Sequence, residues 1–175
     1  EEFVYGLENL AMLDLIFAKA KYAEELKASE PVLHKPVVIH QRSPKHQNEE
    51  PIVETRTLIR LLHARHPLLD PNTVVPIDVD PKPGTRAIVI TGPNTGGKTV
   101  SLKTVGLFAL MAQSGLHIPA QSGSEIPFFH AVYADIGDEQ SIEQSLSTFS
   151  GHITNIIRIL KQIDAHSLVI FDELG

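Results

Sequence analysis

The first part of the chain places apolar residues at steps of three and four. These residues are Phe3, Leu7, Leu10, Leu13 and Phe17. The polar residues that would form the opposite face are Lys19, Lys21, Glu24, Glu25 and Lys27. Steps of three and four match the turn of an α-helix, so the pattern predicts one amphipathic helix over residues 1–28. Pro31 and Pro36 end it, because proline lacks the backbone N–H that a helix needs.

Five short apolar runs follow, with two helical patterns between the later ones. The predicted strands are residues 58–62, 74–79, 86–91, 131–135 and 167–171. The predicted helices are residues 99–113 and 148–163. Strands that alternate with helices indicate an α/β fold with a largely parallel central sheet. A polar stretch bounded by prolines makes residues 31–57 a linker or insertion, between a helical unit of residues 1–30 and a main domain of residues 58–175.

The composition limits the class of protein to which this domain can belong and where in the cell we expect it. The chain has 15 Lys and Arg against 21 Asp and Glu, a formal net charge of −6. Proteins that hold nucleic acid by its phosphates usually carry a basic face, so we expect any such surface to lie outside this segment. The chain has no cysteine, no signal-peptide pattern and no apolar run of membrane-spanning length. We expect a cytoplasmic protein that does not enter a membrane.

The nine histidines raise the question of a metal site. Five of them are His63, His66, His117, His130 and His152. They are scattered and lack the spacing beside cysteines or paired carboxylates that zinc sites show. We interpret them as packing or surface residues.

A glycine-rich loop between the predicted strand 86–91 and the helix after it carries the most specific motif. Its residues are Gly92, Pro93, Asn94, Thr95, Gly96, Gly97, Lys98 and Thr99. They fit the pattern G-x-x-x-x-G-K-[ST] at every fixed position. Glycines leave backbone N–H groups open to a phosphate, and the next helix points its N-terminus at the anion. The motif predicts an ATP site in which Lys98 contacts the outer phosphates and acts in catalysis, and the Thr99 hydroxyl ligates Mg²⁺. The alternative is a glycine-rich turn with a surface lysine.

The last apolar run ends in two carboxylates, Asp172 and Glu173. In P-loop enzymes an aspartate at this place holds Mg²⁺. A carboxylate next to it can polarise the attacking water. We predict that Asp172 binds the metal and that Glu173 is catalytic. The alternative is an acidic strand end or helix cap with no part in the chemistry.

These two motifs resemble the ATPase domain of the MutS family, whose P-loop also has proline and asparagine after the first glycine. Three further segments are similar to the second bacterial MutS paralogue, which lacks the mismatch-reading domain: residues 64–69, 111–116 and 138–149. The resemblance is strong over residues 58–175 and implies an ABC-type P-loop NTPase domain. The first helix resembles, with less specificity, the returning end of the family's long lever arm.

The resemblance also implies roles for residues outside the two motifs. Ser147 matches a signature segment that reaches the ATP of the partner subunit, which implies a homodimer. From the residue alone, a plain helix N-cap is the alternative. Val75 matches the loop that packs on adenine, with a core strand as the alternative, and Val100 follows the P-loop threonine at the nucleotide. The family acts on branched DNA or on stalled ribosomes, so we expect such a partner, contacted mainly outside this chain. The family continues beyond the position of Gly175, so we expect the ATPase fold to be incomplete here and any nuclease activity to lie elsewhere.

Two other interpretations are open. A small-molecule kinase also uses a P-loop, but its arginine-rich lid is not matched here, because Arg158 is the only arginine after the loop. A binding module, in which ATP only holds a dimer together, is not separated from an ATPase by any residue. We favour ATP hydrolysis in a larger nucleic-acid machine.

Overall fold

The computed structural model describes residues 2–34, 59–82, 84–93, 97–136 and 145–172. Most of the predicted linker lies outside these residues, as do Asn94, Thr95, Gly96 and Glu173. In the described part of the chain, no helix is both long enough and apolar enough to cross a membrane.

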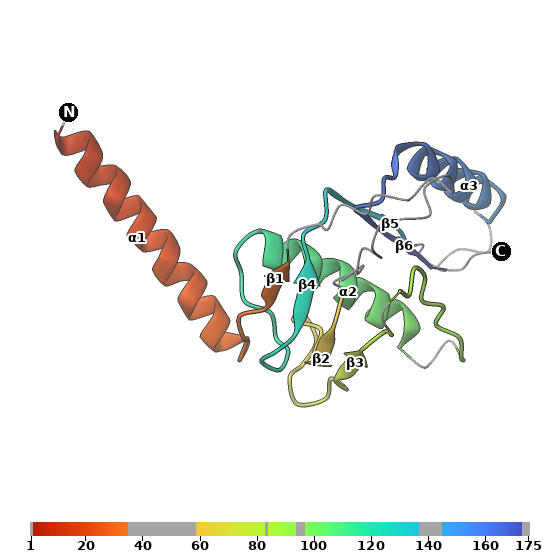
Figure 1. The fold of residues 1–175 in the computed structure, drawn as a ribbon, viewed down its shortest axis with the longest axis horizontal. Helices are drawn as coiled ribbons and strands as arrows, with labels where there is room; N and C mark the ends of the chain where they lie inside the picture. The colour runs from red at the N-terminus through yellow and green to blue at the C-terminus, as the bar shows by residue number, and fades with distance from the viewer. Residues whose placement is uncertain (1, 35–58, 83, 94–96, 137–144, 173–175) are drawn as a thin grey trace, which may run out of the picture.

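The predicted N-terminal helix is α1 (Glu2–Glu25), which projects away from the rest of the molecule (Figure 1). The expected amphipathic character was wrong, because apolar side chains lie on all sides of its first two thirds. The large exposed side chains there are Phe3, Val4, Tyr5, Leu7, Leu10, Met12, Leu13, Leu15, Ile16 and Phe17. A helix that is apolar all round is typical of one that other protein segments cover.

The C-terminal end of α1 is fastened to the body of the molecule. Leu26 packs against the buried core, and Nζ of Lys19 donates a hydrogen bond to the Ser114 carbonyl oxygen at 2.8 Å. Just beyond the helix, Ser29 and Ile118 exchange two backbone hydrogen bonds of 2.9 and 3.0 Å. These contacts join α1 to the segment that follows α2 (Lys98–Gln113).

Two short strand pairs form the middle of the molecule. β1 (Val32–His34) pairs in parallel with β4 (Glu125–Pro127), and β2 (Leu61–Ala64) pairs antiparallel with β3 (Ile77–Val79). An isolated bridge from Arg60 to Glu125 links the two pairs. The predicted strands 58–62 and 74–79 therefore exist with shifted bounds, whereas β1 and β4 were not predicted.

The third strand pair ends beside Asp172, one of the residues predicted to bind the metal. β5 (Ala131–Asp135) and β6 (Ser167–Phe171) run in parallel, and α3 (Ser145–Gln162) connects them. Figure 1 shows α3 beside this pair and α2 near it. Both helices and both strands confirm the sequence predictions. Because parallel strands point the same way, the C-terminal residues of β5 and β6 meet at one edge.

The strand expected at residues 86–91 is not present. Residues 85–91 form no strand or helix, and Ile88, Val89 and Ile90 are 55%, 83% and 42% exposed. A strand is stable only when a neighbour satisfies its backbone groups, and no described segment pairs with this one. The described strands form three two-stranded sheets, and not the single central sheet that we expected.

The buried core gathers around α2 and the small sheets. Its largest fully buried side chains include Phe108 of α2, Leu61 of β2, Ile118 and Ile126. α2 approaches β6 through a glycine, because a Cβ at Gly106 would lie 2.8 Å from Cδ1 of Ile170. The close approach keeps the N-terminus of α2 beside the C-terminal end of β6.

We expect Gly106→Val to destabilise the protein by about 1–3 kcal/mol, because overpacking a filled site forces neighbours to shift. Thermal or urea unfolding measures the change. The control is Gly151→Ala on α3, where a Cβ meets nothing within 4 Å. That variant should stabilise the helix by up to about 1 kcal/mol, since alanine loses less backbone entropy. A Gly106→Val protein as stable as the wild type would contradict the close contact with Ile170.

Candidate nucleotide site

The glycine-rich motif ends at the N-terminus of α2, where the backbone is open to an anion. Gly97 is the N-cap residue with a φ of 75°, and none of the described side chains caps the helix. Gly92 has a φ of 148°. A Cβ on either glycine would meet nothing within 4 Å, so backbone conformation, not lack of space, favours glycine there. Uncapped N–H groups at a helix start are what a phosphate can use.

Lys98 is the first residue of α2, and its side chain reaches back to Gly92. Its Nζ donates a hydrogen bond to the carbonyl oxygen of Gly92. The contact brings the positive charge to the beginning of the loop. An ammonium group held by a neutral carbonyl can exchange that partner for a phosphate oxygen, which binds it more strongly.

Thr99 and Asp172, which are 73 positions apart, meet at the edge of the β5–β6 pair. The Thr99 hydroxyl donates a 2.6 Å hydrogen bond to Oδ2 of Asp172. Asp172 directly follows β6 and Thr99 lies in the first turn of α2, so the packing of α2 on β6 brings them together. One hydroxyl and one carboxylate oxygen are ligands that Mg²⁺ accepts, with waters and phosphate oxygens as the rest. The two residues therefore fit a nucleotide-bound magnesium ion, although no group of three or more metal-ligating side chains occurs among the described residues.

A second acidic residue ends the neighbouring strand. Asp135 closes β5 and is 8% exposed. Its Oδ2 lies 3.0 Å from Nδ1 of His152, and its Oδ1 accepts a 2.7 Å hydrogen bond from Nδ2 of Asn155. Its carbonyl oxygen accepts the backbone N–H of Asp172 at 3.0 Å. Burial alone would raise the pKa of Asp135, but the bonds from Asn155 and His152 outweigh it and hold that pKa below its usual value.

Asp135 was not among the residues predicted for the site. The overlooked signal is an acid at the end of a short apolar strand, which is close to the signal that identified Asp172. His152, interpreted from the sequence as a packing or surface residue, has a partly exposed side chain that packs against this carboxylate. His152 and Asn155 lie three positions apart on α3, so they share a helix face. That face meets the end of β5.

A further acid lies at the opposite end of the same strand pair. Asp164 accepts hydrogen bonds from the Ser167 hydroxyl at 2.7 Å and from the His166 N–H at 2.9 Å, and its Oδ2 lies 3.1 Å from Nδ1 of His130. The Ser167 bond, followed by the contacts with His130 and His166, lowers the pKa of Asp164 to about 2. These contacts stabilise the turn from α3 into β6 and do not involve the P-loop.

The family description "MutS domain V" matches residues 88–175, which include the P-loop motif, Asp135 and Asp172. The chain belongs to the MutS family. It is 55% identical over 175 residues to "Endonuclease MutS2" of Geobacillus sp. (strain WCH70), a match that covers all of this chain and 20% of the relative. It is 54% identical over the same length to "Putative endonuclease MutS2" of Bacillus subtilis (strain 168), with equal coverage. The chain thus spans about one fifth of the length of the curated relatives it matches.

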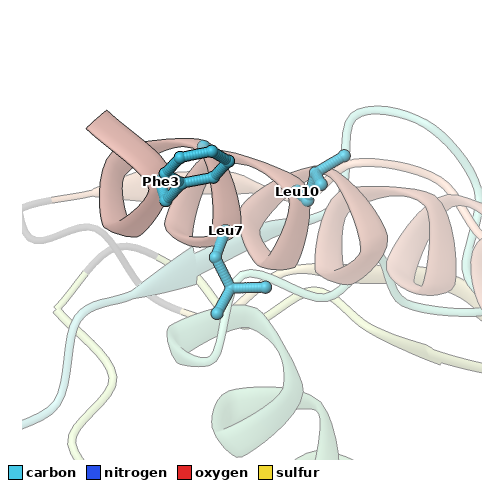
Figure 2. Close-up of a pocket in the computed structure, with 4 residues that line it drawn as sticks. Phe3, Leu7 and Leu10 are labelled. Atoms are coloured by element: carbon cyan, nitrogen blue, oxygen red, sulfur yellow. The ribbon is translucent and has the colours of Figure 1, made fainter. Parts of the chain in front are cut away.

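Three other residues were expected at the site of this MutS-family chain. Ser147 lies in the first turns of α3, and its side chain is outside the described part. Val75 is 78% exposed and Val100 is 37% exposed, which leaves room for a ligand without identifying one. A shallow apolar hollow lies on α1 (Figure 2). It is lined by Phe3, Gly6, Leu7 and Leu10 and by no residue of the glycine-rich motif.

Proposed function

We propose that this chain is the nucleotide-binding part of a MutS-like ATPase, which binds ATP with Mg²⁺ and hydrolyses it. The observation that supports this most is the 2.6 Å contact between Thr99 and Asp172. Two oxygen ligands from distant motifs meet beside an uncapped helix N-terminus, as phosphate and metal binding require. Membership of the MutS family, through a domain that spans both motifs, supports the same function.

In this proposal each residue of the site has a separate task. The backbone of residues 92–97 and the N-terminus of α2 surround the phosphates, and Lys98 leaves the Gly92 carbonyl to bind the outer phosphate oxygens. Thr99 and Asp172 hold the metal, which when bound neutralises charge that develops on the phosphates. Glu173 accepts a proton from the attacking water. Val75 and Val100 make apolar contact with the nucleotide.

The wider architecture that we propose follows the family. Residues 1–30 would be the end of a lever arm, residues 31–57 a linker, and residues 58–175 part of an ABC-type P-loop domain. Two copies would form a dimer in which Ser147 contacts the partner's ATP. The exposed apolar side chains of α1 support its assignment to a lever arm, because a helix that is apolar on all sides is typically covered by other protein segments. The partner on which the machine acts would be branched DNA or a ribosome, contacted mainly outside this chain, and the endonuclease activity in the relatives' names would belong there too.

Titration of a fluorescent ATP analogue into the full-length protein, with and without Mg²⁺, tests the proposal. We expect binding that Mg²⁺ strengthens. Thr99→Val keeps the side-chain volume but removes the hydroxyl, so it should reduce the effect of Mg²⁺ roughly tenfold, since a bond to a charged group contributes about 1.5–3 kcal/mol. Thr73→Val, at a threonine whose hydroxyl bonds only the local Asp70 carbonyl, is the matched control. Mg²⁺-independent binding in the wild type would contradict the proposed metal site.

A further inference from the structure

Asp135 connects three elements at the edge where the proposed nucleotide site lies. Its two carboxylate oxygens contact His152 and Asn155 of α3, and its carbonyl oxygen holds the N–H of Asp172. Asp172 in turn accepts the hydroxyl of Thr99, at the start of α2. A continuous chain of hydrogen bonds therefore runs from α3 through the end of β5 to the proposed metal ligands. In Figure 1, α3 lies beside the β5–β6 pair through which these hydrogen bonds run.

The end of a strand does not need a buried carboxylate with two side-chain partners, as Asp135 has. A buried charge is costly unless it is paired and hydrogen-bonded, and Asp135 is almost fully buried with a partner on each carboxylate oxygen. An apolar residue could end β5 at lower cost, but it could not hold two polar residues of α3.

We propose that Asp135 is a positioning residue for the magnesium–nucleotide site, with His152 and Asn155 as its anchors on α3. It fixes the main chain at Asp172 and ties that residue to the helix whose first turns include Ser147. This inference rests on the proposed function and adds residues that act through Asp172 without touching the nucleotide. Residues that orient a metal ligand typically change metal affinity or activity by about 10- to 100-fold when they are removed.

The variants are made in the full-length protein. Asp135→Asn keeps the side-chain volume but removes the negative charge, so the charge-assisted bonds with His152 and Asn155 are weakened. His152→Leu removes one donor, whereas His152→Asn offers an amide N–H near the place of the imidazole Nδ1 and should rescue the defect. Asp164→Asn is the matched control, because it breaks another aspartate–histidine contact at the far end of the same strand pair.

Three measurements follow each variant: the Mg²⁺ concentration at half-saturation of nucleotide binding, kcat against KM for ATP, and hydrogen exchange of the peptide that contains the Asp172 amide. For Asp135→Asn and His152→Leu we expect half-saturation at an Mg²⁺ concentration about tenfold higher, about a tenfold lower kcat with a smaller change in KM, and faster exchange. Binding without Mg²⁺ should be unchanged. His152→Asn should stay within about threefold of the wild type, as should Asp164→Asn.

Equal effects of Asp135→Asn and Asp164→Asn, or variants that lower only the melting temperature, would show a purely structural role and overturn the inference. His152 is partly exposed, so we expect its variants to fold. Comparison of His152→Leu with His152→Asn therefore distinguishes a positioning role from a structural one even if Asp135→Asn does not fold. A wild-type protein with no Mg²⁺-dependent binding would instead overturn the proposed function, and the inference with it. The wild-type titration therefore separates the two failures.

Discussion

Replacing Lys98 with alanine is expected to reduce ATP affinity at least about 100-fold, which corresponds to roughly 2.7 kcal/mol. Lys98 begins α2, and its ammonium group lies at the Gly92 carbonyl, at the start of the glycine-rich motif. On phosphate binding the group would gain charged acceptors, and each bond to a charged group contributes about 1.5–3 kcal/mol. Alanine keeps the helix but removes every such bond.

Equilibrium titration of a fluorescent ATP analogue measures the loss, and unfolding of the same samples checks the fold. Lys19→Ala is the matched control, because Lys19 also donates to a backbone carbonyl, that of Ser114 at the other end of α2. We expect Lys19→Ala to bind nucleotide as the wild type does. A Lys98→Ala protein that binds ATP with wild-type affinity would mean that the phosphates lie elsewhere, and the proposed site would be wrong.

The elements that sequence analysis predicted correctly are those whose signal is local. The apolar spacing of α2 and α3 and the runs of β5 and β6 lie within short windows. Since parallel strands present their C-terminal ends at one edge, the meeting of Asp172 with the end of β5 was also foreseeable. The strand expected to bring the P-loop helix to that edge is not present, and the packing of α2 on β6 brings it there instead.

The failures arise where neighbours decide the outcome. Residues 86–91 have a strand-like sequence, but a strand forms only against a partner, and none lies beside them in the described part of the chain. β1 and β4 are three residues each, too short to show alternation, and exist because they pair with each other. α1 was predicted as a helix, but its polar face was inferred from its last turns alone.

The candidate site shows the same division between local motif and three-dimensional contact. Glycines, Lys98 and Thr99 are recognisable from their spacing, because a phosphate loop is a local structure. Asp135 is not, because its importance depends on two residues of α3 that only the fold brings to it. A histidine that looks like a surface residue in sequence thus becomes a partner of a buried carboxylate.

The second large effect is expected for Glu173→Gln. We expect ATP hydrolysis to fall by about 10²- to 10⁴-fold, because an amide cannot accept the proton of the attacking water and general bases contribute about that much. Glu173 directly follows Asp172, whose carboxylate contacts Thr99, so in sequence it is the acid next to the proposed metal ligand. Binding of ATP with Mg²⁺ should stay within a few-fold of the wild type, because glutamine has the same size and the metal ligands are intact.

Single-turnover phosphate release, measured beside equilibrium binding, separates the two effects. Asp172→Asn is the contrasting variant, since loss of a proposed metal ligand should weaken Mg²⁺-dependent binding as well as hydrolysis. The same pair tests the competing interpretations. If ATP only holds a dimer together, Glu173→Gln will retain ATP and still support the activity of the full-length protein on its nucleic-acid partner. If hydrolysis drives the machine, that activity will be lost although ATP binds. Wild-type hydrolysis by Glu173→Gln would place the catalytic base at another residue.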